Sequence, residues 1–105
     1  MPGMIVKIFR RDEWDSAVAA GRFAGSADDV RDGFIHFSTA DQLPGTLAKH
    51  YRDETELVIV EVDEAAFGNE LRWEASRDGE KFPHLYDEWN FTTAPPRVID
   101  VPPGN

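Results

Sequence analysis

The feature that most constrains the fold is the run Leu57–Val62, which is almost entirely apolar and β-branched. Neighbouring side chains of a strand point to opposite faces, so an unbroken apolar run predicts a strand that is covered on both sides. Three shorter segments are also predicted to be strands: residues 5–9, 71–73 and 97–101. A sheet that buries residues 57–62 on both faces is therefore expected.

Two short helices are predicted in the first half of the chain. Asp12 can cap the first helix, and Gly21 ends it. Thr39 and Gln42 have the spacing of a capping box ahead of the second helix, which continues as an apolar stripe. Pro44 either kinks the first turn of that helix or marks the point where its regular part begins.

The order of these elements indicates the fold class. Helical patterns near the N-terminus followed by a series of strands are typical of an α+β domain with a mostly antiparallel sheet. Residues 22–33 contain two glycines and several aspartates and are predicted to be a loop. Pro83 is predicted to confine residues 82–86 to an edge strand or an irregular segment. The length fits a single domain over residues 1–105.

Composition excludes several classes of function. The net charge of −9, from 20 acidic and 11 basic residues, opposes binding to bulk nucleic acid or to an anionic membrane. The absence of cysteine excludes disulfides, a thiol nucleophile and cysteine-bound metals, and three scattered histidines predict no metal site. No phosphate-loop or Rossmann glycine motif occurs. No apolar stretch is long enough to span a membrane, so a soluble cytoplasmic protein is expected.

The second informative segment is Asp32–Thr39, a strand-like run with a histidine inside it. Alternation predicts that Phe34, His36 and Ser38 share one face, with the two intervening apolar residues on the other. The run ends at a strand-to-helix junction, where a rigid strand and free backbone N–H groups favour ligand sites. His36 is therefore either a ligand-binding residue or a hydrogen-bonded core histidine.

Two later segments carry the remaining candidate residues. Residues 73–79 combine an aromatic ring, a carboxylate, a hydroxyl and a guanidinium ahead of a glycine: Trp73, Glu74, Ser76 and Arg77. Arginine with serine is suited to hold a phosphate, and the alternative is an ordinary hairpin loop with the tryptophan in the core. His84 and Tyr86 share a face if their segment is extended. Together with His36, His84 would form a two-histidine site.

These residues resemble a small bacterial family catalogued as domain of unknown function 952. The resemblance extends from about Ile5 to Tyr86, and the combination of GFIHFST with FPHLY is specific. Residues 87–93 depart from the usual ending of the family. The resemblance implies a fold similar to that of the ADP-ribosyltransferase superfamily, a bent, split antiparallel sheet with small helices that cradles NAD or a related nucleotide.

The resemblance also implies roles for individual residues. In that superfamily a histidine on an early strand, followed by serine or threonine, binds ribose. A later aromatic residue stacks on nicotinamide, and a glutamate orients the ribose and stabilises the transition state. The matching residues in this sequence are His36 with Ser38 and Thr39, then Tyr86, then Glu74 or Glu88.

Three hypotheses for the function follow. The first is an ADP-ribosyltransferase-like domain that binds NAD or a similar nucleotide, with catalytic residues His36, Glu74 and His84 and substrate-binding residues Ser38, Thr39, Trp73, Ser76, Arg77 and Tyr86. It requires Arg77, His84 and Tyr86 to converge on His36. The second is a two-histidine phosphoesterase, in which the two imidazoles act as general acid and base. The third is a non-catalytic binding or interaction module, in which His36 bonds to Asp29 or Asp32.

Overall fold

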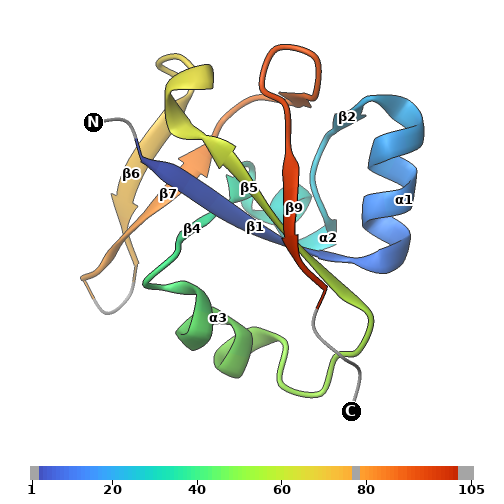
Figure 1. Ribbon diagram of the computed structural model, residues 1–105. Helices are drawn as coiled ribbons and strands as arrows, with labels where there is room; N and C mark the ends of the chain where they lie inside the picture. The colour runs from blue at the N-terminus through green and yellow to red at the C-terminus, as the bar shows by residue number, and fades with distance from the viewer. Residues whose placement is uncertain (1–2, 77–78, 102–105) are drawn as a thin grey trace.

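The structure, a computed structural model, describes residues 3–76 and 79–101 (Figure 1). Its helices are α1 (Arg11–Ala20), α2 (Ala27–Asp32) and α3 (Leu43–His50), with a 3-10 turn at Glu64–Ala66. Its strands are β1 (Met4–Arg10), β2 (Arg22–Phe23), β3 (Ile35–His36), β4 (Ser38–Thr39), β5 (Leu57–Asp63), β6 (Leu71–Ala75), β7 (Lys81–Leu85), β8 (Trp89–Asn90) and β9 (Arg97–Asp100). The pairings among these strands are antiparallel, which confirms an α+β domain with antiparallel sheets.

Strand β5 lies inside a four-stranded sheet of order β4-β1-β5-β9. Its residues 57–60 and 62 are at most 5% exposed, so the predicted burial on both faces is confirmed. β1 pairs with β5 along its whole length, from Met4 opposite Asp63 to Arg10 opposite Leu57. β9 forms the outer edge beside β5. Strands β1 and β5 of this sheet supply a large part of the buried apolar core.

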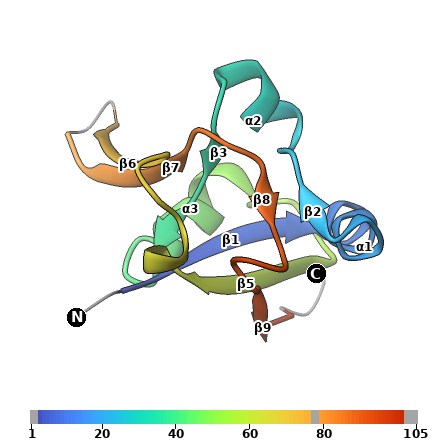
Figure 2. The ribbon, with the colours of Figure 1, turned by 90° about the horizontal axis from the view of Figure 1, so that it is seen from above.

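Two smaller sheets complete the fold. One has the order β3-β7-β6 and the other joins β2 to β8. Figure 2 shows β6 and β7 on the side of the molecule away from α1. Ile35 and Leu85, which are directly paired across β3 and β7, are each 1% exposed and belong to the core cluster. One face of the three-stranded sheet therefore covers the core, and its other face is available for a site.

A buried tryptophan joins these layers. Trp89 is fully buried, and its indole N–H donates a hydrogen bond of 2.8 Å to the carbonyl of Ala94. Its ring centroid lies 5.9 Å from that of Phe9 in β1 and 5.2 Å from that of Phe37 between β3 and β4. The segment after Tyr86 therefore closes the core.

The two predicted helices are present with small changes at their starts. α1 ends at Gly21 in the left-handed region (φ 76°), as predicted, but its cap residue is Arg10 and not Asp12. The backbone N–H of Arg10 donates to Glu13 Oε1 instead. α3 starts after the predicted capping box and has a proline in its first turn. Within the described residues, no helix has the length and apolar character needed to cross a membrane.

The prediction for Pro83 was wrong, because β7 is the central strand of its sheet. Pro83 lies one position beyond the His36–His84 pair, opposite Phe37, where the chain leaves β3. Its carbonyl still accepts a hydrogen bond of 3.0 Å from the N–H of Phe37. The missing donor therefore falls at the end of the short β3 ladder, where it interrupts no continuing pairing.

Two further predictions were wrong. Residues 22–33 are not a loop but contain β2 and α2, and α2 begins with a capping box between Ser26 and Asp29. The run 34–38 is not one strand, because the chain changes sheets at Phe37. Ser38 consequently pairs with Val6 in the four-stranded sheet, while His36 pairs in the three-stranded one.

Candidate functional site

The two histidines meet across neighbouring strands. His36 of β3 lies directly opposite His84 of β7, and their ring centroids are 5.6 Å apart. Residues directly opposite each other in a ladder point to the same face of a sheet. Because the neighbouring Ile35 and Leu85 point into the core, both imidazoles point away from it. The expectation that His36 and His84 converge is confirmed.

Alternation adds five more side chains to this surface, which we call the histidine face. Its members are Phe34, His36, Arg72, Glu74, Phe82, His84 and Tyr86. The Phe34 ring stacks on His84 at 4.1 Å between centroids and lies 4.6 Å from His36 and 5.2 Å from Tyr86. The guanidinium of Arg72 lies 5.1 Å from the Tyr86 ring centroid. Aromatic rings therefore form the middle of the face, with charged groups at its margins.

Both nitrogens of His36 face carboxylates from the α2 segment. Nδ1 lies 2.6 Å from Asp29 Oδ1, and Nε2 lies 3.0 Å from Asp32 Oδ2. The Nδ1 contact is a hydrogen bond, and the Nε2 contact is a close approach of the ring to a second carboxylate. The network hypothesis predicted one of these contacts, and the structure contains both.

Asp29 is anchored by a buried lysine. Lys7 Nζ lies 3.0 Å from Asp29 Oδ2, and the two residues are 5% and 2% exposed. The same carboxylate accepts hydrogen bonds from the backbone N–H groups of Ser26 and His36. Burial alone would raise the pKa of Asp29, but the hydrogen bond from His36 and the charge of Lys7 outweigh it and hold that pKa well below its usual range. Burial lowers the pKa of Lys7, although Asp29 opposes that shift.

His84 has its own carboxylate. Its Nδ1 lies 2.9 Å from Glu74 Oε1, and the Tyr86 hydroxyl donates to the same oxygen at 2.6 Å. The hydrogen bonds from Tyr86 and His84 lower the pKa of Glu74, and the bond to Glu74 raises the pKa of Tyr86. Each histidine is thus oriented through Nδ1 by a different acidic residue. Such orientation fixes the direction in which the other ring nitrogen points.

Several predicted site residues lie elsewhere. Ser38 Oγ is 3.2 Å from Thr46 Oγ1, and the Thr39 hydroxyl accepts the backbone N–H of Gln42, so both serve the junction with α3. Trp73 alternates with Glu74 along β6 and lies on the opposite face of the sheet, where it is 39% exposed. The backbone N–H of Ser76 donates to the Glu80 carbonyl beyond β6. Arg77 lies outside the described residues.

Sequence reasoning missed three members of the arrangement. Phe34 was placed on the correct face but given no role, and Arg72 was overlooked in favour of Arg77. Lys7 was predicted only to be part of a strand, with no role in a site. A signal for it existed, because a single charged residue inside the apolar run 5–9 requires a buried partner.

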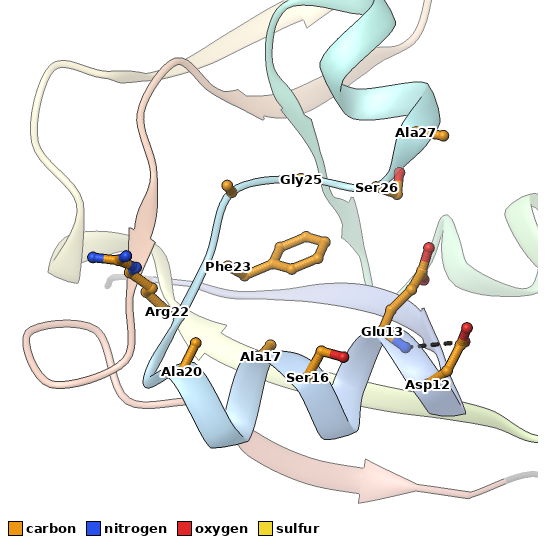
Figure 3. Close-up of a pocket in the computed structure, with 11 residues that line it drawn as sticks. Asp12, Glu13, Ser16, Ala17, Ala20, Arg22, Phe23, Gly25, Ser26 and Ala27 are labelled. Carbon is orange, nitrogen blue, oxygen red and sulfur yellow. Dashed lines mark hydrogen bonds between the residues drawn. The ribbon is translucent and has the colours of Figure 1, made fainter.

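Two hollows of the surface lie apart from the histidine face. Figure 3 shows one of about 490 Å³ between α1 and residues 22–27, bordered by Asp12, Glu13, Ser16, Phe23 and Ser26. A second, of about 280 Å³, lies around Phe67, Glu70 and Asn90. Neither is lined by His36, Glu74 or His84. Among the described residues, no group of three or more His, Asp or Glu side chains is arranged to hold a metal ion.

Comparison with other proteins places the chain in a group of relatives. The model of a family described as "Protein of unknown function (DUF952)" matches residues 8–95. The crystal structure of protein CC0527 from Caulobacter crescentus is 44% identical, with a TM-score of 0.84, and the match covers 94% of this chain and 88% of that one. The solution NMR structure of CC0527 gives 46% identity, a TM-score of 0.81 and coverage of 92% and 83%. No curated protein matches the chain significantly.

Proposed function

This chain belongs to the DUF952 family, and from that premise we propose that it binds a nucleotide of the NAD or ADP-ribose type on the histidine face. The observation that carries the proposal is the direct pairing of His36 with His84, each held by a carboxylate through Nδ1. The separate antiparallel sheets are compatible with the split sheet of the ADP-ribosyltransferase superfamily, which the resemblance implies. Fold alone assigns no reaction, so the argument depends on the side chains.

The chemistry of the face suits the parts of a nucleoside. Stacking of a base on an aromatic side chain contributes roughly 1–3 kcal/mol, and the Phe34 and Tyr86 rings offer such surfaces. The carboxylate of Glu74 and Nε2 of His84 are hydrogen-bonding partners for ribose hydroxyls. Glu74 is 38% exposed and His36 is 37% exposed, so a ligand in solution reaches both. Arg72, on the same face, places its guanidinium 5.1 Å from the Tyr86 ring centroid, and a guanidinium suits a phosphate.

The proposal is tested by NMR titration with NAD, ADP-ribose and adenosine, observed at the ring signals of all three histidines. We expect the signals of His36 and His84 to shift while those of His50, exposed at the end of α3, stay in place. The variant His84→Gln should bind at least about tenfold more weakly, because it loses the ring that stacks on Phe34 and bonds to Glu74. The matched variant His50→Gln should bind as the wild type does. Unmoved His36 and His84 signals with all three ligands would refute the proposal.

The paired histidines favour a second candidate, a phosphoesterase. With each Nδ1 on a carboxylate, one Nε2 would accept a proton from an attacking water while the other donates a proton to the leaving oxygen. In this reaction the new phosphorus–oxygen bond forms with water as the bond to the leaving oxygen breaks. Hydrolysis of a 2′,3′-cyclic nucleotide that is lost in both His36→Gln and His84→Gln would support it, and no hydrolysis by the wild type would dismiss it.

A further inference from the structure

We infer that the position beside His36 Nε2 accepts a phosphate oxygen of the ligand, and that the Asp32 carboxylate fills this position until the ligand displaces it. The inference rests on the proposed function, because it specifies which part of the nucleotide His36 contacts. The starting observation is the 3.0 Å separation between His36 Nε2 and Asp32 Oδ2. An anionic oxygen is therefore already accommodated at this point of the histidine face.

The position of His36 Nε2 is fixed by the hydrogen bond of the other ring nitrogen. Nδ1 is bonded to Asp29, which is buried and held by Lys7 and by the backbone N–H of Ser26. The imidazole cannot turn without leaving a buried carboxylate short of a donor, which is costly. Nε2 therefore stays beside the place where Asp32 Oδ2 now lies, 3.0 Å away. An anionic oxygen suits this place, and a phosphate supplies one.

The contact of Asp32 with His36, in contrast to that of Asp29, lies at the surface and can be exchanged for a contact with a ligand. Asp32 is the last residue of α2, it lies at the surface, and it is followed by Gly33 in the left-handed region at φ 89°. Its Oδ1 also accepts from Arg31 Nε at 3.1 Å, so it retains a partner after it leaves His36. Arg31 lowers the pKa of Asp32 and keeps it charged. A phosphate entering this position would exchange one carboxylate contact for a contact of the same kind.

The chain offers a matched control for a test. Asp28 lies on the same helix and pairs with the same guanidinium, with Arg31 Nη1 at 3.3 Å from its Oδ1, and its contacts do not include His36. Asp32→Ala and Asp28→Ala therefore change the net charge equally and remove one partner of Arg31 each. Only Asp32→Ala empties the position at Nε2.

The experiment compares AMP with adenosine, two ligands that differ by one phosphate, in NMR titrations of wild type, Asp32→Ala and Asp28→Ala. Asp32→Ala should raise the preference for AMP over adenosine at least about fivefold, the factor that one unit charge about 4 Å away gives in water. Asp28→Ala should change it less than about twofold. Thermal melts confirm that both variants are folded, as the exposure of both positions leads us to expect.

Each outcome is decisive for one of the two ideas. Two outcomes would overturn the anion position and leave the proposed nucleotide site standing. In the first, the two variants have equal preferences for AMP over adenosine. In the second, both ligands bind but the preference in Asp32→Ala is that of the wild type. Absence of any shift at His36 and His84, in the wild type and in both variants with both ligands, would overturn the nucleotide site itself.

Discussion

Replacement of Lys7 by methionine tests whether the buried pair beneath His36 holds the site and the fold together. Lys7→Met keeps a long unbranched side chain inside the strand and removes the positive charge. It leaves Asp29, 2% exposed, without its countercharge. Loss of one partner from a buried ion pair costs about 3–5 kcal/mol, because the remaining charge is uncompensated.

The contacts of Asp29 place the expected cost at the lower end of this range. Three donors remain after the substitution: the N–H of Ser26 at 2.9 Å, the N–H of His36 at 3.1 Å and His36 Nδ1 at 2.6 Å. We therefore expect a loss of about 3 kcal/mol in the free energy of unfolding. For a domain of this size, this corresponds to a fall in Tm of roughly 12–24 °C.

Urea unfolding measures this loss, with tryptophan fluorescence as the signal, to which the fully buried Trp89 contributes. The control is Arg22→Met, which removes a surface pair with Glu88 whose atoms are 3.6 Å apart and whose side chains are 66% and 46% exposed. Its cost should stay below about 1 kcal/mol. If Lys7→Met also costs less than about 1 kcal/mol, the reasoning that the buried pair anchors His36 is refuted.

Three other predictions follow from individual contacts. The pKa of Asp29 in the folded protein lies below its ordinary value of 3.8. The stability that its ionised form provides is therefore present above about pH 4 and is lost as the pH falls further. Urea midpoints measured between pH 5 and 2 should show this loss in the wild type and a smaller loss in Asp29→Asn. Tyr86→Phe should raise the pKa of Glu74 toward its ordinary value, as measured by carbon NMR of its carboxylate; an unchanged pKa would contradict the hydrogen bond. Gln42→Ala removes two hydrogen bonds, one from the N–H of Thr39 to Gln42 Oε1 and one of 2.7 Å to the Lys81 carbonyl. It should lower the free energy of unfolding in urea by about 1–2 kcal/mol, and an unchanged value would contradict a stabilising role for these bonds.

The elements that were predicted correctly from sequence alone are those that depend on residues close to one another in the chain. β5 was found because its apolar run is continuous, and the start of α3 was found because Thr39 and Gln42 cap it locally. α2 was missed although Ser26 and Asp29 have the spacing of a capping box. Six residues form a marginal helix in isolation, and α2 depends on the contacts of Asp29 with Lys7 and His36.

The change of sheet at Phe37 was also beyond local reasoning. Alternation assigns faces correctly only while a strand stays in one sheet, and the residues 34–38 give no Gly or Pro signal for a break. The break arises because Ser38 pairs with β1 while His36 pairs with β7. The prediction that Ser38 lies beside His36 therefore failed for a tertiary reason, and the hydroxyl serves α3 instead.

The same distinction explains the site. That His36 and His84 meet was predictable, because two extended segments with face-sharing aromatic residues are natural neighbours in an antiparallel sheet. Which groups control the two rings was not, because Lys7 is 22 residues from Asp29 and Asp29 is 7 residues from His36. In the structure the two histidines have different partners. His84 is bonded to a surface carboxylate that it shares with Tyr86, whereas His36 is bonded to a buried carboxylate that pairs with Lys7 of β1. A ligand can therefore rearrange the partners of His84 at little cost, while His36 stays fixed as the point from which binding on this face is oriented.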